Sequence, residues 1–370
     1  MKRRMLVLLM AVLLGSCASH KNYELVKTEN PIYIPNTAFK GFENLSNPKF
    51  AALRAKYQID TVFHGETDEF KRVLMLRNWI RSLIPINDPG PHPGDGSPES
   101  ILDHALKGSG YHCGHYMVVQ NAVMNAYGYV TRCLGAGPGG ADGVQNHHGI
   151  DEIWLNSYNK WFLSDAKYNS HFEKNGIPLS ALEVRDEYLK NKAKDIVRVK
   201  GLERTPVEFD EEYKMSKEHF ARTYSWLEWY AYSDQYTPDT TLAGDRGILN
   251  MLNDEYFKNH TWMWDKKPHW AYNTKFMRLV SDRNAIDWTP NTIASNIRLD
   301  RNKASIKLSS STPNFKTYQM KDLQGAAWQD ISDSLTLTLN KDSNTFFFRT
   351  LNLAGVAGPE YKVVMVASTK

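Results

Sequence analysis

Residues 110–116 read Gly-Tyr-His-Cys-Gly-His-Tyr, with Cys113 at the centre of the stretch. It opens an apolar-periodic segment that stops at Gly128, so Cys113 is predicted to lie in the first turn of a helix. Unpaired N–H groups and the positive end of the helix dipole favour a thiolate at that position. The same N–H groups can stabilise the oxyanion that forms when a thiolate attacks a carbonyl. We therefore predict that Cys113 is a nucleophile.

A nucleophilic thiol needs a base, which must come from another part of the sequence. His148 begins one strand-like segment and Asp165 ends the next, with a turn at residues 156–160 between them. Positions equidistant from a hairpin turn lie opposite each other in an antiparallel pair, so Asp165 is expected to orient His148 toward Cys113. His147 is the alternative base, but adjacent strand residues face opposite ways, so only one of the two histidines can reach the thiol.

Three sequence motifs follow one another around these residues. A cysteine precedes a helix, a small-residue turn and an Arg-bearing strand within residues 111–132. His148 is followed by a strand with Glu152 four positions later, and Trp161 stands four positions before Asp165. In this order and spacing, the motifs resemble those of the transglutaminase-like superfamily.

The resemblance covers about residues 100–166 and implies an α+β fold with a papain-like core, in which helices pack on an antiparallel sheet. It also implies that Cys113 is the nucleophile, His148 the base and Asp165 the acid that orients the base. The superfamily includes protein cross-linkers, cysteine proteases, peptide N-glycanases and inactive relatives. Its active members attack an amide carbonyl through a thioester.

The resemblance therefore implies a cysteine-dependent amidohydrolase or acyltransferase that acts on amide bonds of a peptide or glycopeptide. Hydrolysis is favoured over cross-linking, because water is abundant outside the cytosol and nothing in the sequence identifies an amine acceptor. The alternative is a catalytically inactive lipoprotein that uses the same fold to bind glycan or peptide.

The N-terminal segment indicates export. Three basic residues at positions 2–4 precede an apolar run at residues 5–14, which is too short to span a bilayer. The run is followed by a cysteine after small residues, which resembles the lipobox of bacterial lipoproteins. We expect a signal peptide at residues 1–16, a lipid on Cys17 and anchoring in the outer membrane, facing the periplasm. An ordinary signal peptide with an incidental cysteine is the alternative.

The charge of the chain excludes one class of partner. The formal net charge is +4, and three of the basic residues lie in the predicted signal peptide. The remaining sequence is close to neutral and mixes both signs, which gives no electrostatic case for binding nucleic acid. The expected partners are a peptide or glycopeptide substrate and, through the N-terminal lipid, a membrane.

Composition divides the rest of the chain into three parts. Residues 17–44 are polar and interrupted by prolines, which predicts a linker. Residues 45–290 are predicted to form the transglutaminase-like domain, with an aromatic-rich and mostly helical extension beyond about residue 180. Residues 291–370 carry short alternating runs separated by turn signals, which predicts a β-sandwich of fibronectin-III or immunoglobulin type.

Five further residues are candidates for substrate binding. Tyr111, His112 and His147 are expected near the thiol, while Trp226 and Trp229 offer a platform for sugar rings or peptide if they are exposed. Apolar residues at helical spacing around these tryptophans indicate a buried core instead. Both interpretations stay open at the level of the sequence.

Other motifs near the thiol favour simpler explanations. Cys133 lies in a strand-like segment where a free cysteine is a small apolar filler, although a disulfide with Cys113 is chemically possible in an oxidising compartment. A zinc site built from these cysteines and nearby histidines lacks the usual ligand spacing, so neither metal nor cofactor is predicted. The glycine-rich residues 135–140 match a dinucleotide fingerprint in form, but Pro138 denies it the required helix, and a loop beside the cleft is predicted.

Overall fold

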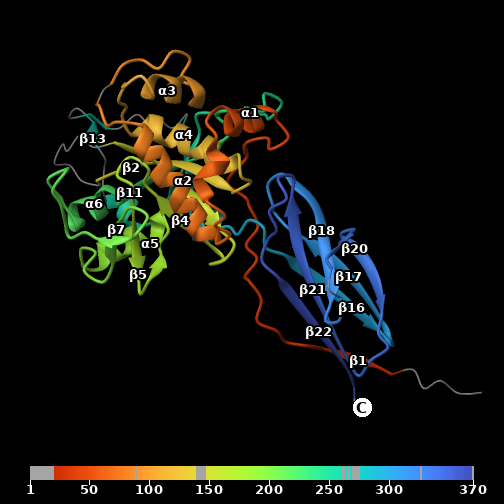
Figure 1. Ribbon diagram of the computed structural model, residues 1–370. Coiled ribbons are helices and arrows are strands. Elements are labelled where there is room, and N and C mark those ends of the chain that lie inside the picture. The colour runs from red at the N-terminus through yellow and green to blue at the C-terminus, as the bar shows by residue number, and fades with distance from the viewer. Residues whose placement is uncertain are drawn as a thin grey trace, which may run out of the picture.

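The computed structural model describes residues 21–88, 90–138, 147–259, 263–264, 267–268, 276–325 and 327–368. The predicted signal peptide and Cys17 lie outside the described residues, as does the end of the glycine-rich segment from residue 139 onward. Among the described residues, no helix combines the length and apolar character needed to cross a membrane. Figure 1 shows a larger lobe of helices and strands beside a lobe built of strands.

The first layer of the larger lobe is helical. It comprises α1 (Lys49–Lys56), the 3-10 turn η1 (Ile59–Phe63), α2 (Glu69–Leu83), α3 (Pro98–Ala105) and α4 (Cys113–Asn125). The side chains of Asp68 and Ser97 cap α2 and α3 by accepting backbone N–H bonds. Helices α1, α2 and α3 all contact α4, which is buried on nearly every side. A helix buried on nearly all sides belongs at the centre of a domain.

A six-stranded mixed sheet forms the second layer. In spatial order it consists of β15 (Met277–Val280), β12 (Leu249–Leu252), β11 (Trp226–Tyr230), β2 (Thr131–Gly137), β3 (His148–Leu155) and β4 (Lys160–Ser164). Strand pairs are antiparallel except β12 with β15. Helix α4 packs against β2 and β3. A second core, which includes Leu134, Trp161 and Trp229, buries the opposite face. Because both faces of the sheet are covered, β2 and β3 are buried along their full length.

Smaller elements surround this sheet. A second sheet has the order β6 (Ile177–Pro178), β5 (Ser170–Lys174), β7 (Val197–Lys200) and β8 (Thr205–Pro206). Two short hairpins are β9 (Phe209–Asp210) with β10 (Met215–Ser216), and β13 (Met263–Trp264) with β14 (Lys267–Pro268). The remaining helical elements are α5 (Ala181–Asn191), α6 (Lys217–Thr223), α7 (Glu255–Asn259) and η3 (Arg283–Ala285). Ser180 and Glu183 form a reciprocal capping box at the start of α5.

The segment beyond residue 180 is less helical than predicted. It contains α5, α6 and α7, but the aromatic run Trp226–Tyr230 forms strand β11 in the middle of the six-stranded sheet. Apolar residues occupy both faces of this strand, so neither a helical nor an alternating period marks it in the sequence. Aromatic residues suit strands well, and pairing with β2 and β12 decides the outcome.

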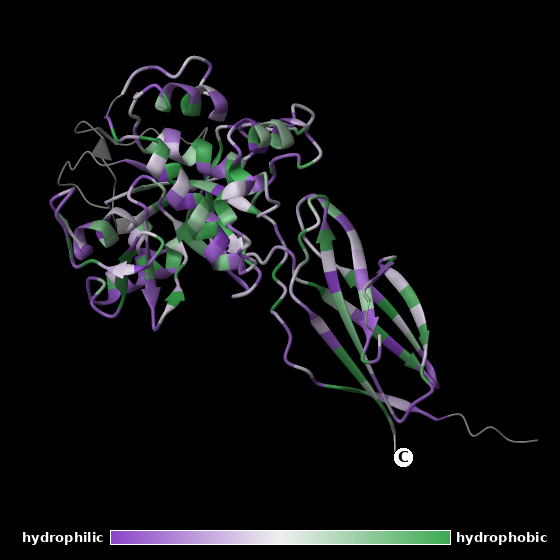
Figure 2. Cartoon of the chain, in the orientation of Figure 1, coloured by the Kyte–Doolittle hydropathy of each residue, from purple (hydrophilic) through white to green (hydrophobic). Residues whose placement is uncertain are grey.

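The second lobe is a β-sandwich. One sheet has the order β1 (Tyr23–Val26), β22 (Tyr361–Ala367), β21 (Ser343–Asn352), β18 (Phe315–Asp322) and β19 (Gln329–Ile331). The other has the order β16 (Ala294–Asp300), β17 (Lys303–Ser309) and β20 (Ser334–Thr338). Ile306, Phe348 and Met365 belong to the core between the sheets, and hydrophobic and hydrophilic residues alternate along these strands (Figure 2). The predicted α+β fold with C-terminal sandwich strands is confirmed.

The stretch predicted as a linker is largely built into the two lobes. Tyr23–Val26 form β1, which pairs with β22 at the edge of the sandwich, and Ala38 and Phe39 join the core of the larger lobe. The linker prediction is therefore wrong for these residues. Three of the four residues of β1 are exposed, so backbone pairing rather than apolar patterning holds the strand. Pairing of this kind leaves little trace in composition.

Direct contacts join the two lobes at the end of α4. Asn352 Nδ2 donates a hydrogen bond to the carbonyl oxygen of Gly128 at 2.9 Å. Gly128 has a φ of +79°, and a Cβ there would lie 2.6 Å from the Cβ of Ala354. Both the backbone conformation and the close approach therefore require glycine. The helix that begins at Cys113 is thus held by the sandwich at its far end.

Candidate active site

Cys113 is the first residue of α4, as the sequence predicts, and is 8% exposed. His112 caps the helix, because its Nδ1 accepts a hydrogen bond from the N–H of Gly114 at 3.2 Å. The first turn lies directly on β3, where a Cβ at Gly149 would come within 3.3 Å of the Cα of Gly114. Because position 149 is a glycine, the N-terminal turn of α4 and the positive end of its dipole can approach the strand that carries His148.

His148 and Asp165 are in direct contact. His148 Nε2 lies 2.6 Å from Asp165 Oδ2, and each side chain is 2% exposed. Because Nε2 faces the carboxylate, Nδ1 is the ring nitrogen that serves the thiol. Cys113 and His148 also lie close enough for each to shift the pKa of the other, which completes the row. The structure therefore brings together the three residues that the sequence predicts as nucleophile, base and orienting acid.

The register of β3 and β4 differs in detail from the predicted hairpin. Asp151 pairs with Ser164, and Leu155 pairs with Lys160, so the connecting loop has four residues rather than five. His148 and Asp165 are consequently offset along the strands instead of lying directly opposite each other. Contact survives because the side chains are long enough to bridge the offset between diagonal neighbours.

The thiol of Cys113 is strongly acidified. Burial by itself raises its pKa, but hydrogen bonds with the side chains of His112 and His148 and with the N–H of Gly149 act in the other direction. Together with the positive charge of His148, they lower the pKa of Cys113 to about 4. The thiolate is therefore present above that pH and is lost as the pH falls through it.

His148 and Asp165 are shifted in complementary directions. Burial lowers the pKa of His148, yet the charge of Asp165 and the hydrogen bond to it raise that pKa to about 9. Burial likewise raises the pKa of Asp165, but His148 and the hydroxyl of Tyr224 lower it to about 2. From about pH 4 to about pH 9, the site therefore holds a thiolate, an imidazolium and a carboxylate in a row.

Asp165 is fixed by more than the histidine. Tyr224 donates its hydroxyl hydrogen to Asp165 Oδ2 at 2.7 Å, and the N–H of Tyr168 donates to Asp165 Oδ1 at 3.0 Å. The ring of Tyr168 also lies against His148, with centroids 5.0 Å apart. Tyr224 was not singled out by the sequence, where it is one aromatic residue among many. Only the tertiary fold distinguishes its hydroxyl from the others.

Two buried arginines hold the turn that follows Asp165. Arg77 Nε donates to Asn169 Oδ1 at 3.1 Å, and its Nη1 donates to the carbonyl oxygen of Ser170 at the same distance. Arg198 donates from Nε and Nη2 to Ser170 Oγ at 3.2 and 3.0 Å. Sequence reasoning missed both residues, although an arginine within the apolar face of a helix, as at position 77, is a signal that a buried polar partner exists.

A comparison with protein-family models covers the part of the chain that holds this arrangement. Residues 57–166 match the family model described as the transglutaminase-like superfamily. This segment is transglutaminase-like. The crystal structure of red sea bream transglutaminase aligns over 88% of this chain and 72% of that chain, with 10% sequence identity and a TM-score of 0.27. No curated protein sequence matches the chain. The transglutaminase-like segment includes α2, α4 and β2 to β4, and so contains Cys113, His148 and Asp165.

The proposed aromatic platform is wrong for the two tryptophans named. Trp226 and Trp229 are 2% and 0% exposed. Trp229 Nε1 donates to Glu152 Oε2 at 2.8 Å, and Trp226 stacks on Phe257 with ring centroids 4.6 Å apart. Both side chains are buried, because strand β11 lies in the interior of the six-stranded sheet.

The other candidates for substrate binding fall in different places. Tyr111 is fully buried with its ring 4.7 Å from that of His115, so it offers no surface to a substrate. His112 lies at the helix start and acts on Cys113 directly. The side chain of His147 is 28% exposed, and its backbone carbonyl oxygen lies 3.7 Å from Cys113 Sγ. Two of the three are therefore beside the thiol.

Cys133 is a core residue. It is fully buried, and Cys133 and Cys113 are both free thiols, so the disulfide alternative is wrong. Burial and the nearby carboxyl group of Asp151 raise the pKa of Cys133 well above its usual value. Within the described ranges, no cluster of three or more His, Cys, Asp or Glu residues is arranged to hold a metal ion.

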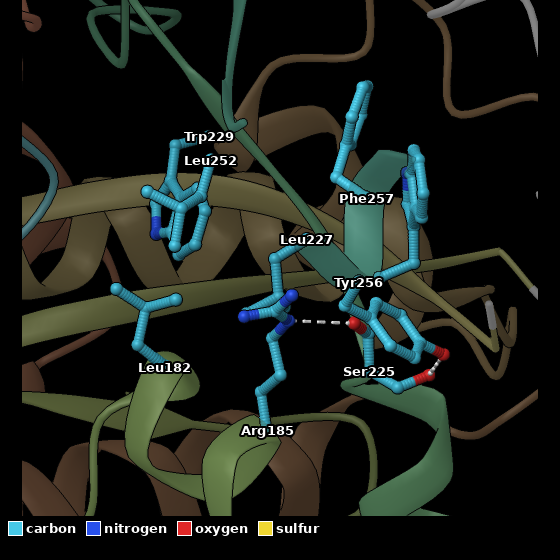
Figure 3. A pocket seen from close by; sticks show the side chains of 9 residues that line it. Leu182, Arg185, Ser225, Leu227, Trp229, Leu252, Tyr256 and Phe257 are labelled. Carbon is cyan, nitrogen blue, oxygen red and sulfur yellow. Dashed lines mark hydrogen bonds between the residues drawn. The ribbon is translucent and has the colours of Figure 1, made fainter. Parts of the chain in front are cut away.

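A small cavity elsewhere in the larger lobe is separate from the catalytic row. Figure 3 shows Arg185 between Leu182 and Ser225, with its Nε bonded to the carbonyl oxygen of Ser225 at 3.0 Å. The cavity has a volume of about 10 Å³ and contains no member of the triad in its lining. That volume holds at most about one water molecule, so the cavity is a packing gap rather than a substrate site.

Proposed function

We propose that the protein is a cysteine-dependent amidohydrolase that cleaves amide bonds in peptides or glycopeptides through a thioester on Cys113. The observation that carries the proposal is the row formed by Cys113, His148 and Asp165, with His148 Nε2 2.6 Å from the carboxylate. The superfamily assignment of residues 57–166 supports it, because active members of that superfamily use a cysteine for acyl transfer.

Each residue has a defined task in the reaction. The thiolate of Cys113 attacks the amide carbon, and the electron pair of the C=O bond moves to oxygen, where N–H groups at the start of α4 stabilise it. The tetrahedral intermediate collapses, the C–N bond breaks, and His148 Nδ1–H protonates the departing amine. The acyl group remains on sulfur as a thioester, and Asp165 stabilises the imidazolium before this proton transfer.

Hydrolysis completes the cycle. Neutral His148 now accepts a proton from water while the water oxygen attacks the thioester carbon. The C–S bond breaks, the substrate leaves as a carboxylic acid, and the thiolate–imidazolium pair is restored. Transfer to an amine would follow the same path with the amine in place of water. Water is the proposed acceptor because it is abundant in the envelope, and the described site shows no feature that selects an amine.

Envelope anchoring is part of the proposal. A lipid on Cys17 holds the chain on the outer membrane, facing the periplasm. Only the residues between Cys17 and Tyr23, where β1 begins, separate that lipid from the sandwich, and they reach at most about 20 Å. The sandwich would then be the lobe next to the membrane. Metabolic labelling with an alkyne fatty acid should mark the wild type and not Cys17→Ala, and equal labelling of both would contradict the anchor.

Activity profiling tests the enzymatic part. A peptidyl electrophile applied to intact cells should label the wild type and the Cys133→Ala control, but not Cys113→Ala. Cleavage of envelope peptides or glycopeptides should be lost in Cys113→Ala alone. Binding of glycan or peptide that is unchanged by Cys113→Ala, together with no labelling of the wild type, would instead support the inactive binding lipoprotein.

A further inference from the structure

A cavity where the two lobes meet lies apart from the catalytic row. Its volume is about 590 Å³, within the range of about 300–1,000 Å³ that is usual for small-molecule sites. Three segments line this interlobe cavity: residues 40–49 and 236–242 of the larger lobe, and residues 313–314, which directly precede β18 of the sandwich. The lining contains no member of the triad. The interlobe cavity is therefore a candidate for a second site.

Buried contacts hold the walls of the interlobe cavity in place. Glu43 is 1% exposed, and its carboxylate accepts hydrogen bonds from the N–H groups of Tyr236 and Thr237 at 2.9 and 2.7 Å. Asn314 Nδ2 donates to the carbonyl oxygen of Glu43 at 2.8 Å, and Asn314 Oδ1 accepts from the N–H of Leu45 at 3.0 Å. All three segments are thus fixed to one another by the chain itself. Binding to walls that are already ordered costs little conformational entropy of the protein.

The first wall presents hydrogen-bond donors. Asn44 Oδ1 and Asn47 Oδ1 each accept a backbone N–H two residues further along, at 3.1 and 3.0 Å, so their NH₂ groups are left to donate. Lys40 is exposed, and within the described residues its ammonium group has no hydrogen-bond or ion-pair partner. The ammonium group of Lys49 donates to one backbone carbonyl oxygen at 3.4 Å and has further hydrogens to donate. These four side chains suit a ligand rich in oxygen atoms.

The opposite wall adds one carboxylate beside apolar side chains. Asp239 Oδ1 accepts from the N–H and the hydroxyl of Thr241 at 2.9 and 2.6 Å, which leaves Oδ2 to accept a hydrogen from a ligand. Pro238 and Leu242 are exposed next to it in the lining, which also includes Phe42.

The lining as a whole selects the class of ligand. It carries two lysines against one aspartate, so it attracts an anion. None of the lining residues belongs to a strand, so the cavity offers no sheet edge to which an extended peptide could add. A ligand that matches the lining therefore combines a negative charge, hydroxyl groups and an apolar face.

We propose that the interlobe cavity binds a carboxylated sugar. The carboxylate of the sugar pairs with Lys40 and Lys49, and its ring and hydroxyl oxygens accept hydrogens from the two asparagines. One sugar hydroxyl donates to Asp239, and the C–H face of the ring packs against Leu242. A phosphate or sulfate ion would fill only part of the cavity and would be repelled by Asp239. This inference goes beyond the proposed amide hydrolysis and does not depend on it.

Calorimetric titration of the full chain with digalacturonic acid and with its methyl ester tests the proposal. The ester keeps the ring hydroxyls but lacks the charges, so the acid should bind at least about fivefold more tightly, and the difference should shrink as salt is added. Lys40→Met and Lys49→Met should each weaken binding of the acid about fivefold, the upper range for one exposed ion pair, and change binding of the ester little. Lys194→Met, an exposed lysine after α5, is the matched control and should bind as the wild type does.

Asp239→Asn distinguishes a sugar from a simple anion. Removing this negative charge should strengthen binding of inorganic phosphate. Binding of digalacturonic acid should gain less or weaken, because an amide NH₂ in place of Oδ2 cannot accept a hydroxyl hydrogen. Equal gains for both ligands would show that the cavity holds a simple anion, and would overturn the assignment of a sugar.

Other results would also overturn the inference. These are an acid that does not bind, equal binding of acid and ester, and wild-type affinity in both lysine variants. Tighter binding of inorganic phosphate or of a triglutamate peptide than of digalacturonic acid would likewise contradict it, in favour of a simple anion or an acidic peptide. Cys113→Ala should bind the acid as the wild type does, and a loss of binding there would place the ligand at the catalytic row. Labelling of Cys113 is measured separately, so this inference and the proposed function can fail independently.

Discussion

Alkylation of Cys113 by iodoacetamide should be nearly independent of pH between about 5 and 8. With a pKa of about 4, the thiolate outnumbers the thiol by about ten to one at pH 5. An ordinary thiol with a pKa of about 8.5 loses thiolate about tenfold for each pH unit below that value. The profile is a better measure than the absolute rate, because a thiolate of low pKa is intrinsically a weaker nucleophile.

Asp165→Asn is the perturbation that tests the cause of this flat profile. Without the carboxylate, burial lowers the pKa of His148, and a neutral His148 no longer stabilises the thiolate. The pKa of Cys113 therefore rises. A rise from about 4 to about 7 would slow alkylation at pH 5 by roughly a hundredfold and leave the rate near pH 9 almost unchanged.

The assay is the rate of alkylation at each pH, followed by mass spectrometry of the peptide that contains Cys113. A Cys133→Ala background removes the other free thiol of the described residues, which is buried. Asp330→Asn, an exposed carboxylate in the sandwich, is the matched control and should keep the wild-type profile. Two results would refute the ion-pair account. One is a wild-type alkylation rate that rises about tenfold per pH unit from pH 5 to pH 8. The other is the same pH profile for the wild type and for Asp165→Asn.

Three further predictions follow from individual contacts. Tyr224→Phe removes the 2.7 Å hydrogen bond to Asp165, so it should raise the pKa of that carboxyl and lower turnover about tenfold. A pH–rate profile measures both effects, and an unchanged profile would show that the hydroxyl is dispensable. Arg132→Met leaves the buried Glu152 uncompensated and should cost about 3–5 kcal/mol in urea unfolding, with partial recovery on adding Glu152→Gln. Gly149→Ala pushes the first turn of α4 away from β3 and should slow alkylation more than it lowers stability, and the reverse order would contradict the close-approach argument.

The parts of the site that are local in sequence could be predicted. The start of α4 at Cys113 follows from the apolar period of the segment that stops at Gly128. The contact between His148 and Asp165 follows from a hairpin, whose two strands are necessarily neighbours. In both cases the interacting residues lie close together along the chain, so the sequence constrains their geometry directly.

The parts that depend on tertiary pairing could not be predicted. Nothing local marks Trp226–Tyr230 as an interior strand, or Tyr23–Val26 as an edge strand paired more than 300 residues away. The hydroxyl of Tyr224 reaches Asp165 across 59 positions, and Glu228 approaches His147 through the pairing of β11 with β2. Each contact requires knowing the strand order of the sheet, which a single sequence does not reveal.

The central claim is that Cys113 forms a thioester during turnover. Intact-protein mass spectrometry after mixing with p-nitrophenyl acetate measures this directly. The account predicts one acetyl group, located on the peptide that contains Cys113, released by hydroxylamine and lost with time as water hydrolyses the thioester. Cys113→Ala should gain none. An acetyl group on another residue, or equal acetylation of wild type and Cys113→Ala, would contradict the assignment of Cys113 as the nucleophile.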